Sequence, residues 1–282
     1  NKGLTVSPIL DAFVDWIWNT FFYYLNSFNI FLLTNVLGPM KQAYLNMPVI
    51  STFVLFMGAG YIIGGLRSCL IVGSLILFIA LSEYWDRTLI TLYMATFAVG
   101  VSAISGIIVG SLCSQNDFAS KSILSICDFF QTFPSFIYLI PVILLFGITD
   151  TSVMIAAIVY ASVPATRYTV EGLRSVPSSL HDAGSMSGVS RLQRWRLIDL
   201  PLALPHIMLG INQTVIFALM MIVLGALIGT EDLGQLIMGS LSRPNGAGIG
   251  FTLGIFISFI CLAIDNLIRT WADERKKLLG IE

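Results

Sequence analysis

The chain has 282 residues, of which 56% are hydrophobic and only 11% are charged, and its mean hydropathy is +0.86. A soluble domain carries about 25% charged residues, and no soluble shape of this size has enough interior to hide so much apolar surface. The net charge of −1 gives no reason to expect a nucleic-acid partner. The composition therefore excludes a soluble globular protein and predicts an all-α polytopic membrane protein.

Residues 10–46 predict an amphipathic helix that is rich in aromatic side chains. Apolar residues recur there at steps of three and four, with polar residues such as Asn19 and Asn26 between them. The apolar positions are Val14, Trp18, Phe21, Phe22, Leu25, Phe28, Leu32 and Val36. Such a helix is suited to lying on a membrane surface. A crossing helix is the alternative, because 16–40 carries no charge.

Seven membrane crossings are expected after this segment, because uncharged runs approach the roughly 20 residues that a helix needs to cross a bilayer. They lie near 48–66, 68–83, 88–113, 132–148, 151–170, 205–229 and 249–270. The expected division of the chain is an N-terminal segment at 1–46, two accessory crossings at 47–86, a core at 87–272 with a polar loop at 174–200, and a tail at 273–282.

The lysines and arginines predict how the chain is oriented in its membrane. If the 171–200 loop is cytoplasmic, alternation places eleven of these residues inside and leaves only Lys2, Lys41, Arg87 and Arg243 outside. Cytoplasmic loops carry an excess of Lys and Arg, and the reverse orientation would invert the ratio. We therefore expect the N-terminus outside and the C-terminus in the cytoplasm.

The polar stretch HDAGSMSGVSRLQRWRLIDLPLALP (181–205) predicts a short helix, a turn and a second short helix. Gly188 fits the left-handed position that commonly ends a helix. Ser190 and Gln193 form a capping-box pattern for the second helix, and Pro201 and Pro205 bracket its exit into the next crossing.

The residues of this stretch leave two functions open. Leu192, Trp195 and Leu197 are available for packing, and three arginines flank them. The stretch could be an amphipathic connector that binds lipid headgroups through its arginines, or a docking element for another protein.

The spacing of the same residues resembles the EAA signature of ABC importer permeases. The pattern is Asp182-Ala183-Gly184, three residues, Gly188, nine residues, and then Ile198-x-Leu200-Pro201. Asp replaces the usual Glu and Gly the second Ala. In that family the loop is a coupling helix that inserts into a groove on the ATP-hydrolysing subunit. The resemblance implies that the first three residues and Gly188 set the geometry of the loop, and that Arg191, Arg194 and Trp195 make the contact.

Three other stretches resemble permeases for glycine betaine and related quaternary amines. They are QTFPSFIYLIPVILLFGI (131–148), GINQTVIFALMMIV (210–223) and EDLGQLIMGSLSR (231–243). The resemblance runs from about residue 85 to 270 and extends weakly to the N-terminal segment. It implies a MetI-like core and a transporter subunit of the bacterial inner membrane.

The same resemblance implies the partners. Two copies of the permease would form the pathway in the lipid bilayer, two ABC ATPase subunits would dock beneath, and an extracytoplasmic binding protein would deliver the solute. The chain contains no GxxxxGK[ST] motif, so we expect ATP and magnesium on the partner ATPase and no cofactor on this chain.

Polar residues within the crossings predict a pathway, because such residues tend to face a bundle interior or a cavity. The candidates are Gln131, Thr132, Pro134, Asn212, Gln213, Met220 and Met221. Hydrogen bonding between helices is the alternative for the polar members, and packing is the alternative for the methionines.

Other features predict no chemistry of their own. The two histidines lack metal-ligand spacing, so no metal site is expected, and no CxxC spacing relates the four cysteines. Asp265 and Arg269 are one turn apart and predict a local ion pair. Glu231 and Asp232 are expected in an outer loop, either solvated or in contact with the binding protein.

Two other classes of protein remain as alternatives. An ion-gradient-driven secondary transporter would be expected to show ionisable pairs deep in the membrane and internal repeats, which the crossings do not show. A membrane-embedded enzyme would need a converging catalytic set, which two histidines in one loop region do not supply.

Overall fold

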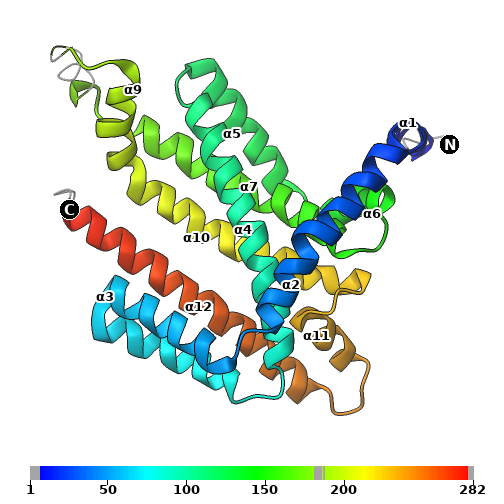
Figure 1. The fold of residues 1–282 in the computed structure, drawn as a ribbon. Coiled ribbons are helices and arrows are strands. Elements are labelled where there is room, and N and C mark those ends of the chain that lie inside the picture. Colours follow the sequence, from blue (N-terminus) through cyan, green and yellow to red (C-terminus); the bar gives the residue numbers. More distant parts are fainter. Residues whose placement is uncertain (1–6, 181–185, 187, 279–282) are drawn as a thin grey trace.

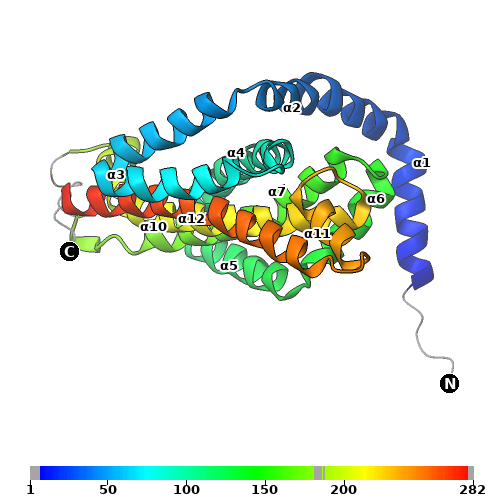
Figure 2. The same cartoon turned by 90° about the horizontal axis from the view of Figure 1, so that it is seen from below.

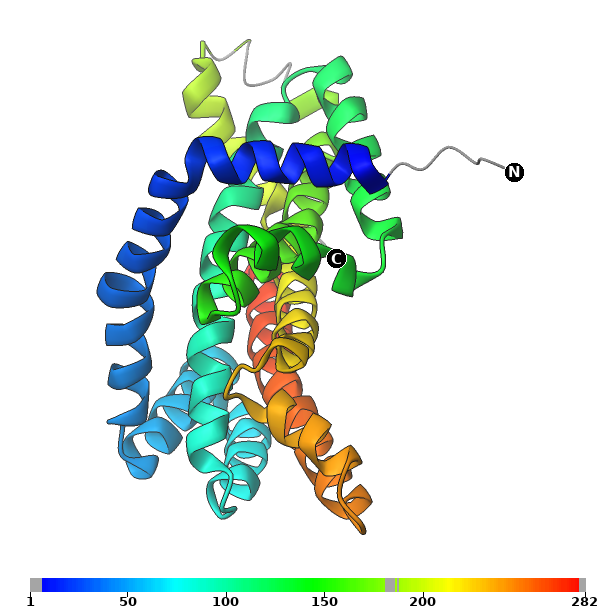
Figure 3. The ribbon, with the colours of Figure 1, turned by 90° about the vertical axis from the view of Figure 1, so that its right-hand side faces the viewer.

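The N-terminal segment forms one nearly continuous helix. The structure, a computed structural model, describes residues 7–180, 186 and 188–278, and begins with α1 (Ser7–Leu32), a π-helical turn η1 (Leu33–Leu37) and α2 (Gly38–Leu45). Figure 3 shows that this segment changes direction before it runs beside the bundle. The buried side chain of Leu37 joins the main core, so the second part of the segment is packed on the protein.

Only part of the predicted apolar face of this helix is packed against the rest of the protein. Val14, Trp18, Leu25, Leu32 and Val36 are half-buried. The aromatic rings of Phe21, Phe22 and Phe28 are exposed, and so are those of Phe13, Trp16, Tyr23, Tyr24 and Phe31. The helix thus has a seam against the bundle and an outer surface of aromatic rings, which matches a helix in contact with lipid.

The two predicted accessory crossings are the arms of one helical hairpin, α3 (Val49–Ala80). Helical geometry breaks at Gly64 and Gly65, and Gly65 has a φ of +63°, which favours glycine. A Cβ added at Gly60 would lie 3.0 Å from Cys69 Cα, and one added at Gly73 would lie 3.0 Å from the side chain of Met57. The arms therefore pack side by side in opposite directions, and the hairpin packs on α12 (Ala247–Leu278) (Figure 2).

Small residues bring the central helices close together. These helices are α4 (Trp85–Cys113), α7 (Asp150–Arg174) and α10 (Leu200–Gly225) (Figure 1). A Cβ at Gly106 would lie 2.5 Å from that of Ala165, and a Cβ at Gly210 would lie 2.7 Å from that of Tyr168. Both contacts involve α7, so α7 is the helix on which α4 and α10 pack, as small residues permit in membrane bundles.

The predicted crossing at 132–148 is not one helix, and this corrects the prediction. It consists of α5 (Asp117–Thr132), a 3-10 turn η2 (Ser135–Tyr138) and α6 (Leu139–Phe146), with a bend of 105° between α5 and the rest. Pro134 stands at the bend, where its ring fixes φ and the residue before it is held extended. The chain at 117–132, expected as a loop, is a helix packed against α7.

The remaining described elements close the two ends of the bundle. They are α9 (Arg191–Arg194), a π-helical segment η3 (Trp195–Asp199), a 3-10 turn η4 (Ala226–Ile228) and α11 (Leu233–Leu241). We call the end that holds 114–116 and 188–199 the α9 end. The end that holds 81–84, 147–149 and 229–246 is the α11 end.

Over the described residues, five helical segments are long and apolar enough to cross a membrane, or six if the bent pair at 117–146 is counted as one. The predicted seven counts the two arms of α3 separately. The all-helical polytopic fold is confirmed, whereas the number seven is not.

Candidate functional site

The described part of the predicted coupling loop has the local geometry that its residues require. Gly188 has a φ of +71°, the left-handed conformation. The Ser190 hydroxyl accepts from the backbone N–H of Gln193 at 3.3 Å, and the Ser190 N–H donates to the Gln193 side-chain oxygen at 2.9 Å. Both bonds of the predicted capping box are therefore present. Asp182, Ala183 and Gly184 lie outside the described residues.

The helix that begins at Ser190 does not stop at Pro201, which corrects the prediction of a separate short helix. α9, η3 and α10 follow one another without a break, and together with η4 they form one 38-residue helical segment, Arg191–Ile228. Pro201 and Pro205 cannot donate the bonds of a regular helix, and the wider turns of η3 lie just before them. The α9 end and the central helix α10 are thus parts of one helical segment.

The side chains of this element divide into an exposed and an inward-facing set. Leu192 and Leu197 are 67% and 70% exposed. Arg194 and Trp195 are half-buried, and the Arg194 guanidinium lies 3.7 Å from Asp199. Arg191 is exposed, and Ile198, Leu200 and Pro201 are half-buried. The outer surface of α9 and η3 therefore presents leucines, which the sequence alone did not separate from Arg194 and Trp195.

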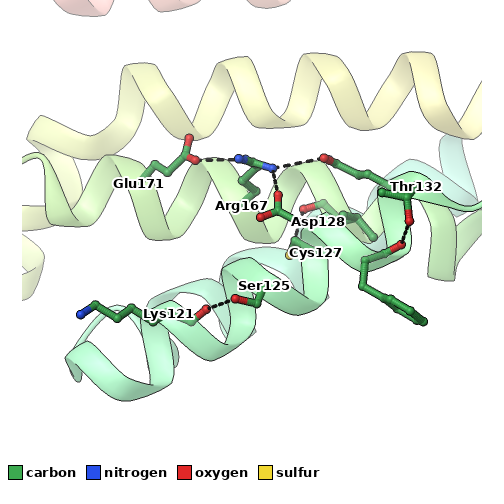
Figure 4. Close-up of polar contacts among 10 residues, drawn as sticks. Lys121, Ser125, Cys127, Asp128, Thr132, Arg167 and Glu171 are labelled. Carbon is green, nitrogen blue, oxygen red and sulfur yellow. Dashed lines mark hydrogen bonds and ion pairs between the residues drawn. The ribbon is translucent and has the colours of Figure 1, made fainter.

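An arginine on α7 holds the end of α5 in place (Figure 4). The Arg167 guanidinium lies 2.5 Å from Asp128, donates to Glu171 at 3.0 Å and donates to Gln131 at 3.2 Å. Thr132 donates to the carbonyl oxygen of Phe129 at 2.7 Å. Two predicted pathway residues, Gln131 and Thr132, thus lie where the bent pair meets α7.

The predicted pathway residues of α10 fall into two sets. Asn212 is buried and donates to Asp265 at 2.5 Å, while Asp265 lies 2.6 Å from Arg269, the predicted ion pair. This is the inter-helix hydrogen bond that the sequence left open as an alternative. Met221 is fully buried in the core. Gln213 is half-buried and Met220 is 49% exposed, so these two lie at the open face of α10.

A row of four aromatic rings lies beside that face, and no spacing in the sequence predicts it. Phe130 of α5, Tyr138 of η2, Tyr160 of α7 and Phe217 of α10 have consecutive ring-centroid distances of 6.1, 5.2 and 4.9 Å. Tyr160 and Phe217 are stacked with an interplanar angle of 19°. The row therefore connects three helices and the turn that follows the bend.

At the α11 end a cluster of charged groups joins α2, α4, α7 and the turn before α11. Lys41 lies 3.2 Å from Glu231 and 3.9 Å from Asp150. Arg87 donates to the carbonyl oxygen of Glu231 at 2.7 Å. Tyr93 donates to Asp150 at 2.8 Å.

Asp232 is fully buried at the edge of this cluster, so the expectation of a solvated outer loop is wrong for this residue. Its carboxylate caps α11 by accepting from the Gln235 N–H at 3.1 Å. The other oxygen, Oδ2, has no hydrogen-bond partner among the described residues. Burial raises the pKa of Asp232 to about 7, against hydrogen bonds from Gln235 and Thr230 that lower it.

The described residues hold no group of three or more His, Cys, Asp or Glu side chains that could bind a metal ion. The four cysteines are free, and His206 is exposed.

Comparison with known proteins identifies the family. Residues 102–277, more than half of the chain, match the family model described as binding-protein-dependent transport system inner membrane component. The chain belongs to this family. The match covers α9 and η3, the row of rings and the α10–α12 pair, and it favours the family predicted from the EAA spacing over the secondary-transporter alternative.

Three relatives show where the chain lies within the family. It is 60% identical over 281 residues to the trimethylamine N-oxide transport system permease protein TmoV of Pelagibacter ubique, covering all of this chain and 39% of that protein. It is 40% identical to TmoV of Ruegeria pomeroyi, over 91% of this chain and 39% of that protein. It is 30% identical to the glycine betaine transport system permease protein OpuAB of Bacillus subtilis, over 97% of this chain and 96% of that protein. The chain thus spans about two fifths of the TmoV proteins and nearly all of OpuAB.

Proposed function

We propose that this chain is the membrane permease part of an ATP-driven importer for small quaternary ammonium or related amine solutes, with trimethylamine N-oxide first among them. The observation that carries the proposal is the 60% identity over the whole chain to a protein named as a trimethylamine N-oxide permease. Glycine betaine, choline and proline betaine follow as candidates, since a more distant relative is named for glycine betaine.

The permease works with partners in this proposal. Two copies form the translocation pathway in the bacterial inner membrane, two ATP-binding-cassette subunits dock at the α9 end, and a substrate-binding protein delivers the solute at the α11 end. ATP and magnesium belong to the ATPase subunits. The α9 end is cytoplasmic, which places the N-terminus outside and the C-terminus inside.

The coupling step follows from the continuity of α9 and α10. When the ATPase subunits close, they move the surface formed by Leu192, Leu197 and Arg191. Because α9, η3 and α10 are one helical segment, this movement tilts α10 against α7 and α12. Asp182, Ala183 and Gly184 together with Gly188 set the angle at which the element enters its groove. Gln131, Thr132, Pro134, Gln213 and Met220 face the pathway.

ATP hydrolysis by the reconstituted complex tests the proposal. The chain would be combined with its ATPase and binding protein, and the rate measured with and without each candidate amine. Gly188→Val strains the left-handed turn and is expected to abolish stimulation by the amine, since a β-branched residue is strongly disfavoured at positive φ. Gly188→Asn is the matched control, because asparagine tolerates this conformation, and it should keep most of the stimulation.

Two results would contradict the proposal. One is a chain that neither binds an ATPase nor changes its rate. The other is uptake that runs on an ion gradient without ATP, which would restore the secondary-transporter alternative.

A further inference from the structure

The row of rings formed by Phe130, Tyr138, Tyr160 and Phe217 lies at the middle of the bundle. Tyr160 is ten residues into α7, which places it about 15 Å from Asp150 at a rise of 1.5 Å per residue. That is about half of the roughly 30 Å of a bilayer core. A solute that crosses the membrane must pass this depth.

The row is open to the same side as the predicted pathway residues of α10. Gln213 and Met220 are four residues before and three residues after Phe217, so the three share one face of the helix. Phe130, Tyr138 and Phe217 are half-buried, and only Tyr160 is buried. Tyr160 belongs to the main core and Tyr138 and Phe217 pack against it, but three of the four rings keep an accessible edge.

Rings are suited to a solute that carries a permanent positive charge. The face of an aromatic ring attracts a cation, and trialkylammonium groups are bound in proteins by rings of this kind. Asp128, two residues before Phe130, and Glu171 are both paired with Arg167, which lies two turns along α7 from Tyr160. The cation would thus meet rings rather than a free carboxylate, and the attraction is weak enough for the solute to leave again.

We propose that the row Phe130, Tyr138, Tyr160 and Phe217 is a transient binding site for the trialkylammonium head of the transported solute, with Gln213 supplying an amide donor to its oxygen end. The proposal rests on the proposed function and names the residues of this chain that recognise the solute during transit. The row gives the permease a selectivity of its own, in addition to that of the binding protein.

Transport by the full complex in proteoliposomes provides the first test. With saturating loaded binding protein, Phe217→Leu is expected to lower the maximal uptake rate about three- to tenfold, the range expected for loss of one ring–cation contact. The concentration for half-maximal uptake should not change, because the binding protein sets it. Phe217→Tyr should restore the rate to within about twofold, since it keeps the ring.

A ring pair elsewhere in the chain supplies the control. Phe259 of α12 contacts Phe78 of α3 at 5.5 Å and is half-buried like Phe217, but it lies outside the row. Phe259→Leu should leave the maximal rate unchanged. If Phe217→Leu does not yield folded permease, Phe217→Met takes its place, because it keeps the volume and removes the ring.

The second test uses the permease alone and separates charge from shape. Saturation-transfer NMR detects weak binding, and the two probes are choline and 3,3-dimethylbutan-1-ol, which replaces the charged nitrogen with carbon. Contact with choline only, lost in Phe217→Leu, supports the site. Equal contact with both probes, or an unchanged maximal rate in Phe217→Leu, overturns it. Failure of the proposed function has a different signature, since the wild-type complex would then show no amine-dependent ATP hydrolysis.

Discussion

The two ends of the bundle differ in the kinds of side-chain contact that they make. At the α9 end, Leu192 and Leu197 stand exposed on a helix that continues straight into α10. At the α11 end, Lys41 lies within 4 Å of both Asp150 and Glu231 and pairs with each of them. Exposed apolar side chains occur at both ends, since Leu241 of α11 is 72% exposed, but at the α9 end they stand on a helix that continues into a central helix. That combination suits a docking surface, whereas a set of paired charges holds helices together.

This difference suggests that the proposed tilt of α10 begins at the α9 end. In the proposed mechanism, a partner bound at the α9 end acts on one continuous helical segment. The charged cluster at the α11 end ties the N-terminal segment and the turn before α11 to α4 and α7. Substitutions at each end separately test this difference.

The largest effect is expected from Leu197→Asp at the α9 end. A charge placed among the apolar contacts of a docking surface is left buried and unpaired, which costs several kcal/mol of binding free energy. We expect binding of the ATPase subunit to fall more than tenfold, at about 1.4 kcal/mol for each factor of ten. Because Leu197 is 70% exposed, the permease itself should fold.

Leu241→Asp is the matched control for this change. Leu241 is 72% exposed, but it lies on α11 at the opposite end. Its substitution should leave ATPase binding unchanged when both variants are measured in nanodiscs. Equal losses in the two variants would mean that the α9 end is not the docking surface.

Sequence patterns predicted the structural features that depend on residues close together in the chain. The capping box of Ser190 and Gln193 and the left-handed Gly188 follow from local hydrogen bonding and sterics, and both are present. The long apolar runs predicted the helices because the length and hydropathy of a segment determine whether it can cross a membrane.

Contacts between distant residues could not be predicted in this way. The row that joins Phe130 to Phe217 depends on how α5, α7 and α10 pack, and no spacing in the sequence encodes it. Asp232 was expected in an outer loop, either solvated or in contact with the binding protein, yet packing buries it completely. A proline at Pro134 disfavours a continuous helix, whereas the long apolar run around it favours a single crossing, and the structure bends at this point.

An intermediate effect is expected from pH at the α11 end. The pKa of Asp232 is raised from 3.8 to about 7 in the folded chain, so between these values the folded state binds more protons than the unfolded state. Asp232 therefore contributes its full stabilisation below pH 3.8, its unfolded-state pKa, and loses it progressively as pH rises to about 7. The free energy of unfolding falls by up to about 4 kcal/mol over this range. The groups around it that also carry charge are Asp150, Glu231, Lys41 and Arg87.

Asp232→Asn tests this dependence. The amide keeps an oxygen to cap α11 and cannot ionise, so the thermal midpoint of the variant should vary less between pH 5 and 8 than that of the wild type. Glu231→Gln serves as the control, because Glu231 is largely exposed, and it should keep the wild-type pH dependence. A variant Asp232→Asn whose midpoint follows pH as the wild type does would show that another group titrates.

The smallest effect is expected from the Lys41–Glu231 ion pair at the same end. The Lys41 ammonium lies 3.2 Å from a carboxylate that is 61% exposed, and pairs of this kind contribute about 0.2–1 kcal/mol. A double-mutant cycle with Lys41→Met and Glu231→Gln should give a coupling energy in this range at low salt. The coupling should shrink at high salt, because exposed charges are screened.

A much larger coupling would change the comparison between the two ends. Lys41 also faces Asp150, whose carboxylate accepts from Tyr93 of α4, so a change at Lys41 can spread through the cluster. A coupling above about 2 kcal/mol would exceed the range of exposed pairs and mean that the cluster acts as one unit. The contacts of the cluster at the α11 end would then form and break together as one cooperative unit.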